Sequence, residues 1–172
     1  LYLKLLYEHF QRELSQVQEI EDSDAPKGFK KLKYQVDAVF NAKAIVEKYG
    51  GVFLSDVVGL GKTYMAALLA QQLDGKNVIV APPALLDENN PGSLTNVFRD
   101  FGIPHKTESI GKLDALGRFL NRIDPEAENY KNVFIDESHR FRTESNQTYE
   151  ELAKICRGRR VILVSATPLN NR

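Results

Sequence analysis

The sequence predicts a three-layer α/β/α protein, with a mainly parallel sheet between two layers of helices. Short apolar runs of strand type alternate along the chain with longer amphipathic runs of helix type. This alternation is typical of parallel sheets that helices cover on both faces. The first apolar run also leads into a glycine turn and then into an alanine- and leucine-rich helix, an arrangement suited to binding phosphate.

Length and composition are those of a globular domain. The 172 residues are enough to bury a core, and 42% of them are hydrophobic and 27% charged. The 23 basic and 23 acidic residues cancel, which neither favours nor excludes a nucleic-acid partner, because a basic stripe can be hidden in a neutral total. The single cysteine, Cys156, excludes an internal disulfide, and no apolar run reaches the length of a membrane span. We therefore expect a cytoplasmic protein with no membrane partner.

The two ends of the sequence look cut. The chain begins at Leu1, inside a helical pattern, and stops at Arg172 after a polar turn, so we expect a fragment of a larger protein. Apolar residues at steps of three and four predict an N-terminal amphipathic helix: Leu3, Leu6, Phe10, Leu14 and Val17. An acidic, turn-prone linker follows, so that residues 1–25 form the helix and linker and residues 26–172 the α/β domain.

Helices and strands are expected to alternate through the α/β domain. Apolar residues at helical spacing predict helices over 34–49, 62–73, 94–101, 112–123 and 149–155. Short apolar runs predict strands over 52–55, 78–81, 133–135 and 161–164, and a weak strand is expected over 105–110. Gly50-Gly51 ends the first helix, Pro82-Pro83 stops the second strand, and Ser93 is expected to cap the third helix.

The turn after the first strand has the form of a phosphate-binding loop. Gly59 and Gly61 permit backbone turns that aim successive N–H groups at one phosphate, and the helix that begins near Lys62 adds its positive N-terminal dipole. Lys62 can reach the β- and γ-phosphates, and the Thr63 hydroxyl is placed to ligate Mg²⁺. Asp56 stands where the strict Walker A pattern has glycine. The alternative is an ordinary strand–helix turn with a chance Lys-Thr pair.

Polar residues that suit the same chemistry follow two later strands. Asp136-Glu137 comes directly after an apolar strand, as in a Walker B site, where one carboxylate holds Mg²⁺ and the next polarises the attacking water. The alternative is a solvated loop. Ser165 and Thr167 place two hydroxyls at the end of the last strand, although alone they would be turn residues. His139 alone would be an ordinary loop histidine.

These motifs together resemble those of the superfamily 2 helicases, in the same order along the chain. The resemblance covers residue 30 to residue 172 and rests on five segments: the glutamine motif over 32–39, motif I over 56–63, motif Ia over 80–83, motif II over 136–139 and motif III over 165–168. The Gly-Leu-Gly-Lys-Thr form of motif I, with Asp56 before it, is closest to the Swi/Snf-type DNA translocases. In that family the first Walker glycine is not required.

The resemblance implies a first RecA-like lobe that binds ATP and Mg²⁺ between itself and a second lobe. It implies binding of the nucleotide by Gln35, Asp56, Gly59, Leu60, Gly61, Lys62, Thr63 and Tyr64, with Gln35 reading the adenine edge. Thr63 and Asp136 would hold Mg²⁺, Glu137 would activate water, and Lys62, Asp136 and Glu137 would form the catalytic set. His139, Ser165, Thr167 and Pro82 would couple the nucleotide to nucleic acid, which the family implies is double-stranded DNA.

Some departures from the family pattern matter. Ser138 replaces the usual alanine of motif II, Leu94 lies where tryptophan often follows motif Ia, and we find no motif Ib. No second lobe is present in residues 26–172, so the arginine fingers expected from it are absent. We therefore expect this lobe to bind ATP but to hydrolyse it poorly alone. Alternatives are a nucleotide-gated protein-remodelling or interaction module, an RNA helicase lobe, and a small-molecule kinase.

Overall fold

The computed structural model describes residues 33–55, 61–87, 89–122, 125–136 and 146–165. The predicted N-terminal helix, the linker and the division of the chain at residue 25 lie outside these residues, so they stay predictions.

The described strands form one parallel sheet with the order β1-β5-β4-β2-β3. The strands are β1 (Gly51–Ser55), β2 (Lys76–Ala81), β3 (His105–Ser109), β4 (Tyr130–Asp136) and β5 (Arg160–Ser165). The last strand in the chain, β5, lies between the first and the fourth. All five predicted strands are therefore confirmed, including the weak one, which lies at an edge of the sheet.

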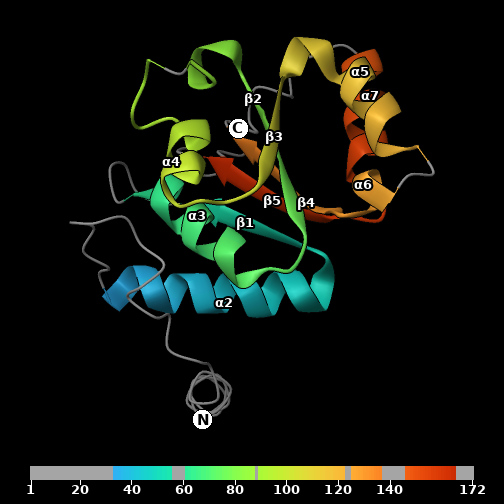
Figure 1. Ribbon diagram of the computed structural model, residues 1–172. Helices are drawn as coiled ribbons and strands as arrows, with labels where there is room; N and C mark the ends of the chain where they lie inside the picture. Colours follow the sequence, from blue (N-terminus) through green and yellow to red (C-terminus); the bar gives the residue numbers. More distant parts are fainter. Residues whose placement is uncertain (1–32, 56–60, 88, 123–124, 137–145, 166–172) are drawn as a thin grey trace, which may run out of the picture.

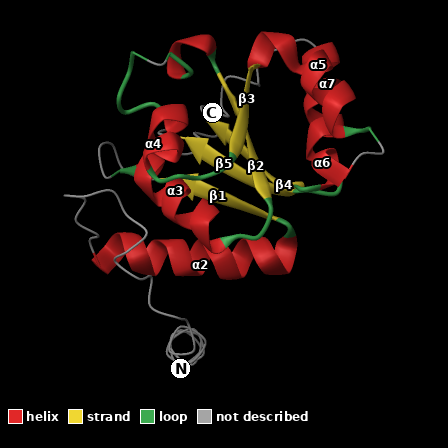
Figure 2. Ribbon diagram, in the orientation of Figure 1, coloured by secondary structure: helices red, strands yellow, loops and turns green. Residues whose placement is uncertain are grey.

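Helices cover both faces of this sheet, as Figures 1 and 2 show. The helices are α2 (Lys33–Tyr49), α3 (Lys62–Gln72), α4 (Leu94–Asp100), α5 (Leu113–Leu120), α6 (Pro125–Glu128) and α7 (Asn146–Cys156), with short 3₁₀ turns η2 (Pro83–Leu85) and η3 (Ile110–Lys112). In Figure 1, α2, α3 and α4 lie on one side of the sheet and α5, α6 and α7 on the other.

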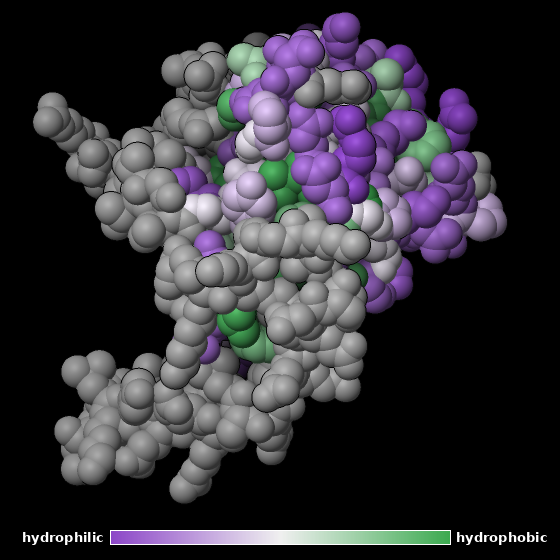
Figure 3. Space-filling model, turned by 60° about the vertical axis from the view of Figure 1, so that its left-hand side comes forward, coloured by the Kyte–Doolittle hydropathy of each residue, from purple (hydrophilic) through white to green (hydrophobic). Residues whose placement is uncertain are grey.

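Alternating side chains of the strands divide the core into two layers. Ile79, Phe134 and Ile162 are paired across the sheet and are fully buried with α2, α3 and α4. Their neighbours Val78 and Val133 point to the opposite face and are buried with α5 and α7. On the face shown in Figure 3, hydrophilic residues cover most of the described surface. The apolar runs of the sequence therefore form two cores, one on each side of the sheet.

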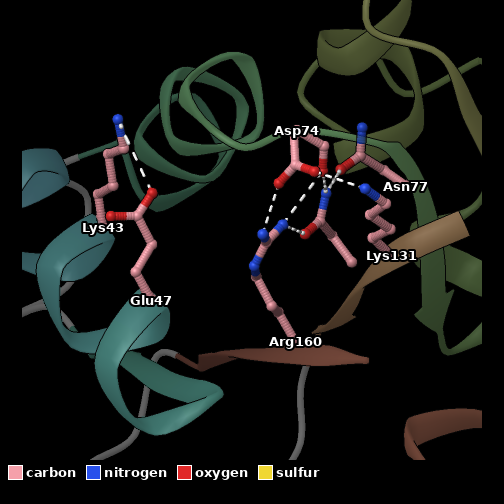
Figure 4. A network of polar contacts seen from close by, with 7 residues as sticks. Lys43, Glu47, Asp74, Asn77, Lys131 and Arg160 are labelled. Atoms are coloured by element: carbon pink, nitrogen blue, oxygen red, sulfur yellow. Dashed lines mark hydrogen bonds and ion pairs between the residues drawn. The ribbon is translucent and has the colours of Figure 1, made fainter. Parts of the chain in front are cut away.

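A polar network closes the edge of the sheet where the strands begin. Asn77 and Asn132 are paired in register and buried, and the Asn132 Nδ2 group donates a hydrogen bond of 3.1 Å to Asn77 Oδ1. Arg160 donates to Asn132 Oδ1 at 3.0 Å and also to the Asp74 carboxylate, and Lys131 Nζ lies 2.6 Å from the other Asp74 oxygen (Figure 4). The turn before β2 is thus tied to β4 and β5.

The differences between predicted and observed helices are small and have local causes. Ser93 caps α4 as predicted, because its Oγ accepts a hydrogen bond from Asn96 N at 3.2 Å. The predicted polar connection before β4 contains the four-residue helix α6, which begins at Pro125 and is too short to show a helical period. In the part of the chain that the structure describes, no helix is long and apolar enough to cross a membrane.

We expect the substitution Asp74→Asn to lower stability at neutral pH but not in strong acid. Hydrogen bonds from Lys131 and Arg160 lower the pKa of Asp74 from its ordinary value of 3.8 to about 2. A carboxyl whose pKa is depressed by folding stabilises the protein above its unfolded pKa and loses that contribution as the pH falls through the folded pKa. The pair is largely exposed, so the expected loss at pH 7 is at most about 1 kcal/mol.

Urea unfolding at pH 7, 4 and 3 would measure the difference in the free energy of unfolding between the wild type and Asp74→Asn. The difference should shrink as the pH falls from about 4 towards 2 and should also shrink in high salt. Asp114→Asn, which removes an exposed pair within helix α5, is the matched control and should change stability less. A difference independent of pH would contradict the prediction.

Candidate nucleotide-binding site

The parallel strands bring the predicted motifs to one edge of the sheet. In the β1–β5 pair, Ser55 lies opposite Ser165, and in the β4–β5 pair Asp136 lies opposite Val164. β1 ends at this edge, α3 is the next described element after it in the chain, and Pro82 follows β2 there. Segments that are far apart in the sequence therefore lie side by side, in the order Ser55, Ser165, Asp136 and Pro82 along the edge.

Helix α3 begins at this edge with an open first turn. Gly61 has a left-handed backbone, with φ 85° and ψ 37°, and precedes the first helical residue, Lys62. The N-cap residue is this glycine, which has no side chain to cap the turn. The helix is buried from Met65 to Ala70, whereas Lys62 and Thr63 are half-buried. The open first turn therefore presents backbone donors, an ammonium group and a hydroxyl, which is the donor set that binds phosphate.

Gln35 of α2 lies against the end of the phosphate loop. Only 5% of this residue is exposed, and its Nε2 atom would lie 2.9 Å from a Cβ atom added at Gly61. That distance is shorter than real Cβ contacts, so a side chain at position 61 would displace the amide. The structure therefore brings together Gln35 and Gly61, which the sequence predicted for one site, and gives a steric reason for glycine there in addition to its positive φ.

Ser165 ends β5, the strand beside β1, and Asp136 ends β4, the next strand across the sheet. Asp136 is half-buried at the end of β4, and Ser165 is 1% exposed at the end of β5. At the usual spacing between strands, Asp136 lies about 10 Å along the edge from β1, with Ser165 between them. A carboxylate at this distance from the phosphate loop suits an indirect role through a metal ion, and a buried hydroxyl between them suits a role in relaying changes at the site.

Two further predicted residues flank these groups. Pro82 is buried directly after β2, and the absence of an N–H on Pro82 and Pro83 explains why the strand stops there. Tyr64, in the first turn of α3, is 37% exposed, and its ring centroid lies 6.2 Å from that of Phe101. The sequence did not single out Phe101, which lies at the end of α4, the helix that packs beside α3.

The remaining predicted site residues lie outside the described part of the chain. These are Asp56, Gly59, Leu60, Glu137, His139 and Thr167. Their roles stay predictions, and so does the assignment of catalytic or metal-binding chemistry to Lys62, Thr63 and Asp136.

The described groups with shifted pKa values lie away from this edge. Burial raises the pKa of the Cys156 thiol to about 11, so this thiol stays neutral at physiological pH. Burial also lowers the pKa of Arg159, whose guanidinium donates to the carbonyl oxygens of Leu120, Tyr130 and Ile155 at 2.7–3.0 Å. These two groups, and the Asp74 carboxyl, therefore serve the fold rather than the site.

The sequence analysis missed the asparagine pair that closes the opposite edge. The signal was present, because the tripeptide Lys-Asn-Val begins at Lys76 and again at Lys131. The two copies lie on neighbouring strands with their asparagines in register. A repeated polar residue at the same place in two apolar strands indicates a paired contact between them.

Comparison with known proteins places this site in context. The family described as "Type III restriction enzyme, res subunit" (ResIII) matches residues 28–170. The curated "Uncharacterized ATP-dependent helicase YqhH" of Bacillus subtilis (strain 168) is 27% identical to the chain over 157 residues, which are 84% of the chain and 28% of that protein. The chain therefore spans less than a third of this relative.

Two solved structures have a similar fold. The first, "Sulfolobus solfataricus SWI2/SNF2 ATPase core in complex with dsDNA", has a TM-score of 0.66 at 14% identity over 91% of this chain and 36% of that one. The second, the UvsW helicase from bacteriophage T4, has a TM-score of 0.52 at 14% identity over 94% of this chain and 60% of that one. The predicted RecA-like α/β fold is confirmed by these likenesses and by the observed sheet.

We expect Gly61→Ala to impair both folding and nucleotide binding, and Gly102→Ala to impair folding alone. Both glycines have positive φ, 85° and 65°, so alanine costs about 1–2 kcal/mol at either position. The described structure places nothing within 4 Å of a Cβ at Gly102, whereas at Gly61 the buried Gln35 amide must also move. That amide is the far end of a side chain, so its movement adds less to the cost than the positive φ does.

Chemical unfolding and calorimetry with ATP would measure the two effects. Gly61→Ala should lose more stability than Gly102→Ala and should bind ATP at least tenfold more weakly, about 1.4 kcal/mol. Equal losses of stability and unchanged binding in both variants would contradict a steric role for the contact between Gln35 and Gly61.

Proposed function

This chain belongs to the ResIII family, described as type III restriction enzyme, res subunit, and from that membership we propose that it is the ATP-binding lobe of a nucleic-acid-dependent ATPase. The family confirms the predicted resemblance to helicases. The observation that carries the proposal is the order of groups along one edge of the sheet: the open first turn of α3, then Ser165, then Asp136. This edge offers cationic and backbone donors at one place and a carboxylate two strands away.

The first turn of α3 would hold the phosphates of ATP. Its backbone N–H groups and positive dipole favour an anion, and Lys62, the first residue of the helix, adds a full positive charge. The left-handed backbone of Gly61 turns the chain into the helix without a side chain in the way. Asp56, Gly59 and Leu60 would complete the loop from the β1 side.

The half-buried hydroxyl of Thr63 and the carboxylate of Asp136 fit the oxygen ligands that Mg²⁺ prefers, Asp136 through water. Mg²⁺, when bound, would neutralise charge on the phosphates. Glu137, the next residue after Asp136, would accept a proton from the attacking water. The chain thus supplies phosphate binding, metal ligands and a base, which are three of the parts that phosphoryl transfer needs.

The fourth part, a cation that stabilises the transition state, would come from a second lobe. Removal of such an arginine lowers rates by roughly 10³–10⁵ in other NTPases. The chain spans 28% of its curated relative and 36% of the first similar structure, which leaves room in such proteins for further domains. Residues 26–172 would form the first lobe and residues 1–25 an appended helix and linker. This lobe alone would bind ATP and hydrolyse it poorly.

The nucleic acid would lie along the same edge, at its β2 end. Pro82 lies there, and Ser165 lies between β1 and β4, where it can respond to changes at either strand. His139 and Thr167 would join Ser165 in coupling the nucleotide to this surface. One similar structure is described as a complex with dsDNA, which supports duplex DNA as the partner. Such an enzyme would work in the cytoplasm, where it would couple ATP hydrolysis to movement on DNA.

We expect Lys62→Ala and Glu137→Gln to separate binding from hydrolysis. Lys62→Ala removes a charge-assisted contact with phosphate and should weaken ATP binding by about 10- to 100-fold. Glu137→Gln should keep ATP affinity and lower turnover by about 10²–10⁴. Calorimetry with ATP–Mg²⁺ and a phosphate-release assay on the complete gene product would measure both, with exposed Lys48→Ala as the control. Rapid turnover by residues 1–172 alone would contradict the need for a second lobe.

Duplex DNA should stimulate ATP hydrolysis by the complete protein. If phosphate contacts dominate, the logarithm of DNA affinity should fall linearly with the logarithm of salt concentration, with a slope of about −0.9 for each phosphate neutralised. Filter binding or fluorescence anisotropy between 50 and 200 mM salt would measure this slope, since such affinities fall steeply over about that range. Stimulation by RNA alone would favour an RNA helicase, and stimulation by neither would favour a protein-remodelling ATPase.

A further inference from the structure

We propose that the outer side of β1 is a docking surface for one further helix and strand, supplied by the part of the complete gene product that follows residue 172. The strand would pair with β1 in the parallel direction, and the helix would cover Phe53, Val161 and Leu163. This surface is separate from the candidate nucleotide site, and its occupant does not depend on nucleotide binding.

An apolar row across the sheet becomes more exposed towards β1. Ile135, Leu163 and Phe53 are paired in register on β4, β5 and β1, so their side chains point to the same face, that of α5 and α7. Ile135 is 2% exposed, Leu163 is half-buried and Phe53 is 38% exposed. On the opposite face Leu54 and its partner Val164 are both buried. In the described structure, the helices of the α5 and α7 face therefore leave its β1 end uncovered.

The residues of β1 are those of an interior strand, although the described sheet ends there. Within the described residues β1 pairs with β5 alone. Gly51–Ser55 contains no charged residue and no proline, which are the residues that protect a true edge from pairing. The opposite edge strand, β3, carries Lys106 and Glu108 and no aliphatic residue. The composition of β3 suits an edge that stays open, and that of β1 suits a second neighbouring strand.

The backbone of Phe53 is turned to the outer side of β1. Gly50 O accepts a hydrogen bond from Val161 N at 2.9 Å, so position 50 faces β5. Alternate residues of a parallel strand bond to the same neighbour, so Val52 and Leu54 face β5 as well. The N–H and C=O groups of Phe53 therefore point away from β5, towards the place where a further strand would lie.

The handedness of the crossovers decides which face the next helix would cover. The connections from β1 to β2 and from β2 to β3 run in one direction across the sheet, and their helices α3 and α4 lie on one face (Figure 1). Those from β3 to β4 and from β4 to β5 run back, and their helices α5 and α7 lie on the other face. This coupling of direction and face is the right-handed rule for parallel strands. A connection from β5 to a strand beyond β1 continues the return direction, so its helix belongs over Phe53, Val161 and Leu163.

The length of the chain places this strand beyond residue 172. Residues 166–172 are too few for a crossover, which takes about 10 residues or more including its helix. The chain spans 28% of its curated relative and 36% of the first similar structure, so proteins of this kind have further residues to supply a helix and a strand. The occupant would have the chemistry of this fold, namely an amphipathic helix followed by a short apolar strand.

Photocrosslinking of the complete gene product would identify the occupant. With p-benzoylphenylalanine in place of Phe53, mass spectrometry should find crosslinks to residues beyond 172 of the same molecule. The matched control has the same group in place of Lys106, an exposed residue on the same face of the opposite edge strand, and should give no crosslink to that segment. Crosslinks from position 53 to residues 1–25, or to a second molecule, would overturn the proposal.

Hydrogen exchange tests the pairing of β1 in the unmodified complete protein, so it does not depend on the folding of a variant. Thr107 is the matched amide, because Pro104 O accepts from Asn77 N at 3.2 Å and the same alternation turns Thr107 to the outer side of β3. The Phe53 amide should exchange at least about a hundredfold more slowly than the Thr107 amide, since paired interior strands open far less often than free edges. Equal exchange at the two amides would overturn the proposal, and so would slow exchange at Phe53 without crosslinks beyond residue 172.

Discussion

The parallel pairing of β1, β5 and β4 is the constraint on which the candidate site depends. Parallel strands all end at the same edge, so the residues that follow them are neighbours whatever their separation in the sequence. Because β5 lies between β1 and β4, Ser165 is placed between the phosphate loop and Asp136. In the consecutive order β1-β4-β5, Ser165 would lie outside the site. The position of one strand therefore decides which groups can act together.

The two edges of the sheet have opposite polar chemistry. At the edge where the strands begin, Asn77, Asn132, Asp74 and Arg160 bind one another, so buried polar groups there find partners within the protein. At the other edge, the N-cap residue of α3 is Gly61, which has no side chain to cap the first turn. Hydrogen bonds at the first edge hold the strands in register, while the second edge carries the residues proposed to bind the nucleotide. Stability and binding are thus carried by different ends of the same strands.

Gly61 links the local backbone to the surroundings of the site. Its positive φ starts α3 in the required direction, and its missing side chain makes room for Gln35 and Tyr64. Gln35 belongs to α2, and α2 packs against α3. The glutamine therefore reaches Gly61 only when both helices are packed on the sheet. The loop is therefore shaped by packing as well as by its own sequence.

The sequence by itself determined the elements and the chemistry that they carry. It predicted all five strands, four of them from apolar runs, and its helical periods predicted all but the single-turn helices. Its glycine turn with Lys62-Thr63 and the Asp136-Glu137 pair predicted the kind of ligand. These features are local, and local spacing is what a sequence displays directly. Only the tertiary structure decided the strand order and the pairing of Asn77 with Asn132. It also decided the close approach of Gln35 to Gly61 and the ring contact between Tyr64 and Phe101. Each of these joins residues that are 26 or more positions apart, and contacts of that range are fixed by how the layers pack rather than by any local pattern.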